Sequence, residues 1–154
     1  MPERWIGVVA ATDHVIIVDA DVPANGPITI EADHRWTLQA GDRAAAYAVM
    51  HQRMLDYVRD QHIQRVVIKA SALSMGSTKM GHLASCEVRG VVISAAASLA
   101  PTRLIAKALI SRTFGSRKAD EYLRDDAFWG QETNGAALRV GSREAALVIL
   151  AARK

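Results

Sequence analysis

The sequence predicts an α/β domain built on one mixed β-sheet with helices on both faces. Two observations support this. The first 38 residues contain three strand patterns joined by short turn signals, which is typical of an antiparallel meander. The remaining chain alternates helical patterns with short apolar runs, which is typical of parallel strands and crossover helices. A length of 154 residues suits one domain, 1–154.

The three N-terminal strands are marked by β-branched residues and by turns. Residues 4–10 (RWIGVVA) and 15–19 (VIIVD) flank the turn ATDH and predict a hairpin. Two prolines bracket Asn-Gly in the loop at 21–27. Residues 28–38 then alternate apolar and polar side chains, which predicts a third strand.

A helix is predicted from 43 to about 62, with Asp42 as its N-cap. Its apolar residues recur at spacings of three and four, so they share one face. These residues are Tyr47, Met50, Met54 and Val58. The continuous apolar run at 65–69 (RVVIK) predicts a central strand covered on both faces.

Two further elements complete the predicted sheet. A largely apolar helix is expected at 79–99, and residues 102–106 form a weaker fifth strand. The predicted sheet has five strands in the order 3-2-1-4-5, with strand 65–69 beside the first strand.

The C-terminal third is predicted to be helical. Residues 107–130 indicate two short helices broken at Gly115-Ser116, and residues 131–136 indicate a loop. Ser142 is expected to cap the last helix, whose apolar face should pack on the sheet.

Composition narrows the classes of function. There are 19 Lys and Arg residues against 16 Asp and Glu, and the net charge of +3 permits an anionic partner without requiring one. The single Cys86 excludes an internal disulfide and fits a reducing cytoplasm. We expect no signal peptide, no membrane span and no cofactor. The five histidines show no zinc-ligand spacing.

Several stretches resemble RuvC-type Holliday-junction resolvases, which have a ribonuclease H-like fold. RWIGVVAATDHVIIV resembles their first hairpin, and RVVIKAS resembles their fourth strand. HLASCEVRGVVISAAA (82–97) resembles the helix that follows, and it is the most specific of these stretches. TFGSRKADEYLRD and SREAALVILAA resemble two later segments. Small uncharacterised RuvC-like bacterial proteins are more similar still, because they share the compact length and the VVI strand.

The resemblance implies two-metal phosphodiester hydrolysis, in which carboxylates hold divalent ions. The family pattern needs an Asp within the first strand, an acid ending the fourth strand, and one or two Asp at the start of the last helix. The corresponding residues here are Val9 (Val8 or Ala10 in a shifted register), Lys69, Ser142 and Glu144. One carboxylate cannot hold two magnesium ions, so we predict no catalytic residue and no metal site.

Lys69 has two interpretations. It could extend from the strand end into water, as lysines ordinarily do. Alternatively, it could be an internal cation that replaces the metal charge and pairs with Glu144 or meets a phosphate.

Two polar segments are candidate nucleic-acid contacts. The loop after the fourth strand is rich in Ser, Gly and Lys and leads into a helix N-terminus, which suits an anion. The densest basic stretch follows the fifth strand. The candidate residues are Lys69, Ser71, Ser77, Lys79, Arg112, Arg117 and Lys118. The alternatives are a solvated loop and a salt-bridged helix surface.

Three functions remain open. The missing carboxylates favour an inactive module that binds, scaffolds or dimerises, on nucleic acid or within a nucleic-acid-processing or defence assembly. An active metal-dependent nuclease could instead use relocated acids, namely Asp13, Asp19, Asp21 and Glu31. A subunit that contacts only proteins is the third. The apolar circumference of helix 79–99 also predicts a homodimer.

Overall fold

The computed structural model describes residues 1–71, 80–115 and 117–154. The strands are β1 Glu3–Ala10, β2 His14–Val22, β3 Ile28–Thr37, β4 Arg65–Lys69, β5 Thr102–Ile105 and β6 Thr133–Gly135. The helices are α1 Arg43–Asp60, α2 Met80–Ala97, α3 Lys107–Thr113, α4 Ala119–Leu123, α5 Asp126–Glu132 and α6 Arg143–Arg153, with a 3₁₀ turn at Val140–Ser142.

The strands form one mixed sheet in the order β5-β4-β1-β2-β3-β6. β1, β2 and β3 pair antiparallel, whereas β4 pairs parallel to β1 and β5 pairs parallel to β4. The order predicted for the first five strands is therefore confirmed, with β4 beside β1.

The prediction of five strands was wrong, because a sixth strand lies where we expected a loop. Thr133–Gly135 pairs parallel with Ile28–Ile30 of β3. The N–H of Ala136 continues the pairing by donating to Ile30 O. An unpaired strand edge exposes backbone donors and acceptors, and the chain returning from α5 satisfies those of β3.

Two helix predictions also need correction. Residues 107–132 form three helices, because the Asp125 carboxylate accepts the backbone N–H of Phe128 and caps a separate α5. Ser142 lies at the N-cap position of α6 but makes no side-chain capping bond. By contrast, Asp42 caps α1 as predicted, accepting from Ala44 N.

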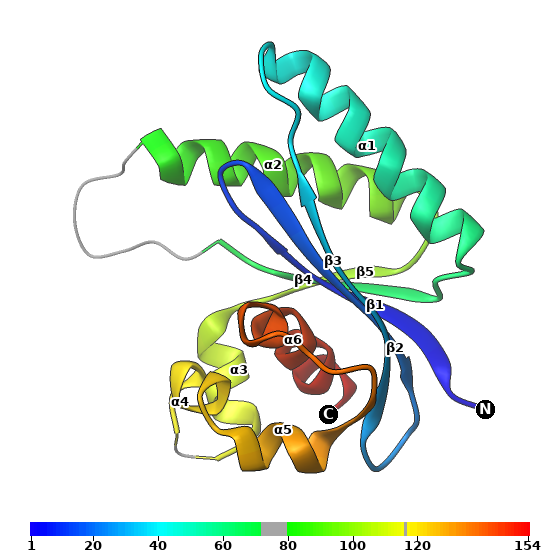
Figure 1. Ribbon diagram of the computed structural model, residues 1–154, viewed down its shortest axis with the longest axis vertical. Coiled ribbons are helices and arrows are strands. Elements are labelled where there is room, and N and C mark those ends of the chain that lie inside the picture. Colours follow the sequence, from blue (N-terminus) through cyan, green and yellow to red (C-terminus); the bar gives the residue numbers. More distant parts are fainter. Residues whose placement is uncertain (72–79, 116) are drawn as a thin grey trace.

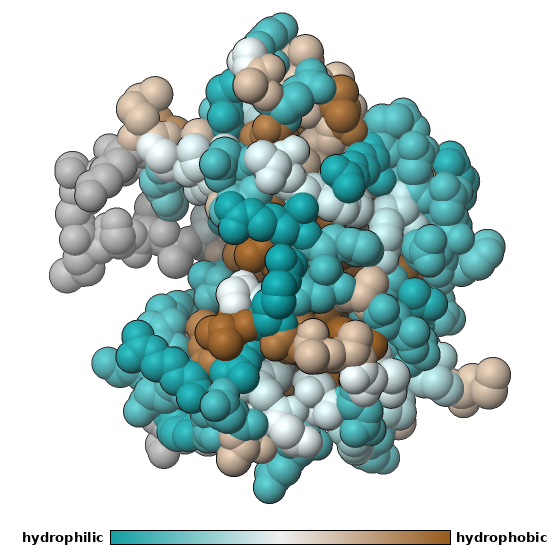
Figure 2. Space-filling view, in the orientation of Figure 1, coloured by the Kyte–Doolittle hydropathy of each residue, from teal (hydrophilic) through white to brown (hydrophobic). Residues whose placement is uncertain are grey.

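The two faces of the sheet carry separate hydrophobic clusters. α1 and α2 cover one face, and α3 to α6 cover the other (Figure 1). Side chains alternate along β1, so Ile6 and Val8 face α1 and α2 while Trp5 and Val9 face α6. Figure 2 shows that hydrophilic residues cover most of one face of the molecule, with hydrophobic residues chiefly in the belt between the two layers.

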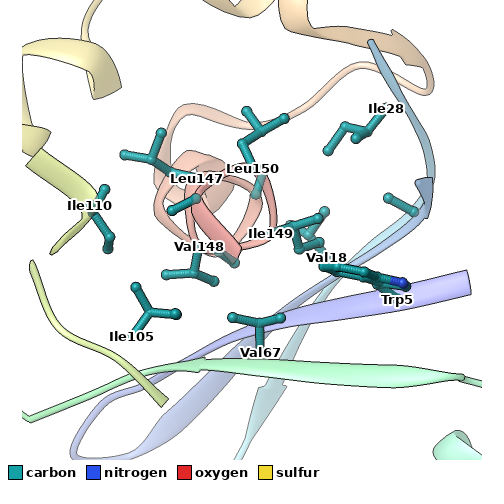
Figure 3. Packing of buried hydrophobic residues seen from close by; sticks show 14 of the residues in the cluster. Trp5, Val18, Ile28, Val67, Ile105, Ile110, Leu147, Val148, Ile149 and Leu150 are labelled. Carbon is teal, nitrogen blue, oxygen red and sulfur yellow. The ribbon is translucent and has the colours of Figure 1, made fainter. Parts of the chain in front are cut away.

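α6 is the core helix of its layer. Every residue from Ala145 to Ala151 is buried, although the sequence predicted burial of one face only. Leu147, Val148, Ile149 and Leu150 point in several directions around the helix axis, towards residues such as Ile110 and Val67 (Figure 3). α3 and α4 cover the side of α6 that the sheet leaves open, which explains the burial all round.

Gly7 lets α6 approach β1 closely. A Cβ at Gly7 would overlap the backbone carbonyl of Ala145 and lie 2.9 Å from Ile149 Cγ1. The first turn of α6 therefore rests directly on the middle of β1, and the absence of a side chain at Gly7 sets the height of the helix.

We expect Gly7→Ala to destabilise the fold by about 3 kcal/mol, because the backbone of α6 must move to admit the methyl group. Equilibrium unfolding in urea would measure the loss.

Gly130→Ala in α5 is the matched control. A Cβ at Gly130 meets nothing within 4 Å, so this helical substitution should leave stability unchanged or raise it by about 0.5–1 kcal/mol. Equal stabilities for the two variants would contradict the close approach at Gly7.

Candidate functional site

The candidate site lies where β1 and β4 end. These strands run parallel with Val8 opposite Ile68, so the next residues, Val9 and Lys69, lie at the same level along the sheet. Both side chains belong to the face that packs against α6, because Val9 contacts the α6 cluster and Lys69 pairs with the helix. Glu144 occupies the first turn of α6. The fold thus brings together Val9, Lys69 and Glu144, three of the four positions that the sequence analysis aligned with the nuclease pattern.

Lys69 forms an ion pair with Glu144. Its Nζ lies 3.0 Å from Glu144 Oε1, and the two side chains are 21% and 24% exposed. The positive end of the α6 dipole also favours a carboxylate in the first turn. Of the two interpretations of Lys69, the internal pair is the one observed.

A second ion pair extends this arrangement. Lys107 Nζ, at the start of α3, lies 3.0 Å from Asp120 Oδ2 in α4. The hydrogen bond from Lys107 lowers the pKa of Asp120, and the nearby charge of Lys69 lowers this pKa further. Glu144, Lys69, Asp120 and Lys107 therefore form a sequence of alternating charges, which we call the charge network.

The sequence analysis missed Lys107 and Asp120. Lys69 stands opposite Ile105 in the β4–β5 pairing, so Lys107 follows two residues beyond the equivalent strand end. The predicted pairing of strand 65–69 with strand 102–106 already implied that Lys107 lies near Lys69. Asp120 comes close only because α4 folds back, which the sequence pattern did not indicate.

Ser142 takes a different role from the one predicted. Its hydroxyl donates to Asp33 Oδ1 over 2.6 Å, while Nε and Nη2 of Arg139 bind both carboxylate oxygens at 2.9 and 2.7 Å. Burial raises the pKa of Asp33, but the bonds from Arg139 and Ser142 outweigh it and hold this pKa below its ordinary value. Asp33 thus ties the segment before α6 to β3 and was missed by sequence reasoning.

Arg143 points towards α4 and α5. Its Nη1 donates to Leu123 O at 2.9 Å, and its Nη2 lies 2.7 Å from Asp126 Oδ1. Its Nε is buried without a hydrogen-bond partner among the described residues. We infer that Arg143 braces α6 against the neighbouring helices.

Arg89 of α2 fastens the ends of both strands from the opposite face. The residue is 8% exposed. Its Nε donates to Lys69 O at 3.1 Å, its Nη2 to Ala10 O at 3.3 Å, and its Nη1 to Ser71 Oγ at 2.5 Å. Arg89, the arginine of the Arg-Gly pair in this helix, therefore holds the backbone of both strand ends at the candidate site.

The relocated acids do not converge on Glu144. Asp19 is fully buried on the α1 face, where Arg4 Nη2 and the Tyr57 hydroxyl bind its Oδ2 at 2.9 and 2.6 Å. Burial, followed by this bond to Asp19, raises the pKa of Tyr57. The other three acids are also placed elsewhere. Asp21 stands opposite Arg4 near the start of β1 and approaches Glu31, and Asp13 pairs with His14 in the hairpin turn.

The predicted basic residues lie on the layer that contains α3 and α4. Arg117 pairs with Asp125 at 2.8 Å and lies over the ring of Tyr122. Arg112 and Lys118 are exposed. Ser77 and Lys79 fall outside the described residues.

The described residues were also compared with what a metal site and a membrane-spanning helix require. Within residues 1–71, 80–115 and 117–154, no three His, Cys, Asp or Glu side chains gather in a way that could hold a metal ion. None of the helices in these ranges is both long enough and apolar enough to cross a bilayer.

The sheet order and the helical layers define a RuvC-like, ribonuclease H-like fold, as the sequence predicted, and comparison with solved structures confirms it. RuvC from Thermus thermophilus superposes with a TM-score of 0.75 and 13% identity, covering 96% of this chain and 92% of its own. The structure of T. thermophilus RuvC in complex with a Holliday junction substrate superposes with a TM-score of 0.72 and 11% identity. It covers 97% of this chain and 91% of its own.

A third structure, the yeast mitochondrial Holliday junction resolvase Ydc2, has a TM-score of 0.62 and 9% identity, covering 98% of this chain and 76% of its own. No known protein family and no curated protein matches the sequence. The likeness therefore concerns the fold.

We expect Lys69→Ala to destabilise the protein by roughly 1–3 kcal/mol, because it leaves a partly buried Glu144 without its counter-ion. Thermal or urea unfolding would measure the change. The Lys69→Ala, Glu144→Gln double variant should lose less than the sum of the single variants, because the charge left unpaired is then also removed.

Arg59→Ala is the control for this measurement. Arg59 pairs with Asp56 and Asp60 but is 60% exposed, so its removal should cost less than about 0.5 kcal/mol. An unchanged melting temperature for Lys69→Ala would show that the ion pair with Glu144 contributes nothing to stability.

Proposed function

We propose that the chain is a catalytically inactive RuvC-like module that binds nucleic acid as a homodimeric scaffold. The observation that carries this proposal is the Lys69–Glu144 ion pair. In the family pattern, carboxylates hold metal at the end of the fourth strand and the start of the last helix. Here one of those positions is an ammonium group that engages the carboxylate at the other.

Electrostatics argue against a metal between these residues. Mg²⁺ needs several oxygen ligands in octahedral geometry, whereas Val9 offers none and Glu144 already binds Lys69. A divalent ion about 4 Å from an ammonium group would be repelled by about 8 kcal/mol at an effective dielectric constant of 20. Lys107 adds a second positive charge to the same region.

The basic residues around this site suit a phosphate backbone better than a metal. Lys69 and Lys107 are each paired with a carboxylate, whereas Arg112 and Lys118 on the same layer are exposed and are the proposed phosphate contacts. A solved structure with this fold is a RuvC complex with a Holliday junction substrate. We therefore favour branched DNA as the ligand, bound through phosphates and with strong salt dependence.

Dimerisation is proposed through the outer face of α2. From Leu83 onward, its exposed residues recur at spacings of four, three, four and three, so they share one face of the helix, along which a second helix could pack. These residues are Leu83, Glu87, Gly90, Ser94 and Ala97. Gly90 and Ser94 also line an open groove of about 560 Å³ with Tyr47 and His51 of α1. Small residues along such a seam let two helices approach closely, and a two-fold axis would close the contact.

Light scattering at micromolar concentration should report a dimer for the unmodified chain, and Gly90→Arg should report a monomer. An arginine at the centre of the seam places bulk and charge where the second helix must pack. Circular dichroism would establish that the variant remains folded.

Gly130→Arg is the matched control, because a Cβ at this helical glycine of α5 also meets nothing within 4 Å. It should remain dimeric. A monomeric unmodified chain, or a Gly90→Arg dimer, would rule out this interface.

For nucleic acid, fluorescence anisotropy should detect binding to a four-way junction in EDTA, with an affinity that falls as salt rises. The double variant Arg112→Glu, Lys118→Glu should bind more weakly, since both phosphate-facing charges are reversed. Neither Mg²⁺ nor Mn²⁺ should produce cleavage of junction, duplex or single-stranded DNA.

The results of these experiments distinguish the proposed module from an active nuclease and from a subunit that contacts only proteins. Mn²⁺-dependent cleavage that Glu144→Ala abolishes would establish an active nuclease. No binding to any nucleic acid would favour a subunit that contacts only proteins. As a positive control, Val9→Asp with Lys69→Glu should restore weak Mg²⁺ binding by calorimetry but not cleavage, because the supporting residues around a metal are also missing.

A further inference from the structure

β5 leaves one edge of the sheet open. In the order β5-β4-β1-β2-β3-β6 it is the outermost strand, and within the described part of the chain no strand pairs with its outer side. The N–H of Ala70 donates to Ile105 O, so the backbone of Ile105 faces β4. Because backbone groups alternate in direction along a strand, those of Thr102 and Leu104 face outward, where a further strand could pair with them.

Apolar side chains flank this edge on the face that α1 and α2 cover. Leu104 stands opposite Ile68, whose side chain belongs to the cluster under α1 and α2, so Leu104 lies on that face. Leu104 is 45% exposed, and Leu99, in the connection from α2 to β5, is 50% exposed. Side chains of adjacent strands on one face contact each other, so an apolar residue of an added strand would cover Leu104.

The other face of the same edge carries positive charge. Arg103 is exposed and stands opposite Val67, which belongs to the α6 cluster. Arg103 and Arg65 line a hollow of about 100 Å³ on this face. Arg65 pairs with Glu3 at 2.9 Å. Among the described residues Arg103 has no carboxylate partner, and its Nη1 donates to Ala152 O at 3.5 Å. Two guanidinium groups thus accompany one carboxylate, which favours an acidic side chain in a bound segment.

We propose that the open edge of β5 binds an extended segment of a partner protein in which apolar and acidic residues alternate. Main-chain hydrogen bonds to Thr102 and Leu104 hold this segment as an added strand. Because successive residues of a strand point to opposite faces, its apolar residues meet Leu104 while its acidic residues meet Arg103. An antiparallel pair of β5 strands from two copies would instead bring two Arg103 side chains together on one face, which like charges disfavour.

The test measures fluorescence anisotropy of two short labelled peptides, one in which Val and Glu alternate and one in which Val and Lys alternate. The unmodified chain should bind the Val–Glu peptide at least about tenfold more tightly than the Val–Lys peptide. Arg103→Glu should reverse this preference, because the charge beside the edge is then negative. Arg124→Glu, at the exposed end of α4, changes the net charge equally and should keep the preference for Val–Glu.

A backbone substitution provides the second arm. Leu104→Pro removes an outward N–H and no bond to β4, and it should weaken Val–Glu binding at least about tenfold. Circular dichroism would establish that this variant is folded, and the charge reversal at Arg103 decides the question if it is not. Equal affinities of the unmodified chain for the two peptides, or a preference that survives Arg103→Glu, would overturn the proposal. Self-association that Leu104→Pro abolishes would also overturn it, because a second copy would then occupy the edge.

Discussion

The close seating of α6 on β1 determines the geometry of the candidate site. Because Gly7 has no side chain, the carbonyl of Ala145 rests against the strand, and the start of the helix is fixed in height. Glu144 then reaches Lys69 on one side of β1, and Ser142 reaches Asp33 on the other. A helix buried along nearly its whole length keeps its polar residues at its ends, where these two anchors lie.

The consequence is a site built from paired charges. The charge network joins α6, β4, α4 and α3, and each carboxylate in it faces an ammonium group. In a two-metal site, divalent ions would neutralise clustered carboxylates. In this chain lysines neutralise them, so the charge balance at the ends of β1 and β4 is met by side chains of the protein.

α2 connects this site to the surface. Arg89, on its inner side, holds the carbonyls of Ala10 and Lys69, and the exposed stripe from Leu83 to Ala97 lies on its outer side. A single helix therefore combines the clamp on the strand ends with the proposed dimer seam.

Sequence patterns alone predicted the fold class, the order of the first five strands and the α1 cap, because these depend on local periodicity, turn residues and short connections. The prediction that Val9 and Lys69 stand where the family pattern has acids likewise came from the sequence alone. Which charges meet depends instead on how segments far apart in the sequence pack together. Lys107, Asp120, Asp33 and Arg139 come from segments whose packing no local pattern specifies. β6 was missed for the same reason, since three residues form a strand there only because the unpaired edge of β3 lies beside them.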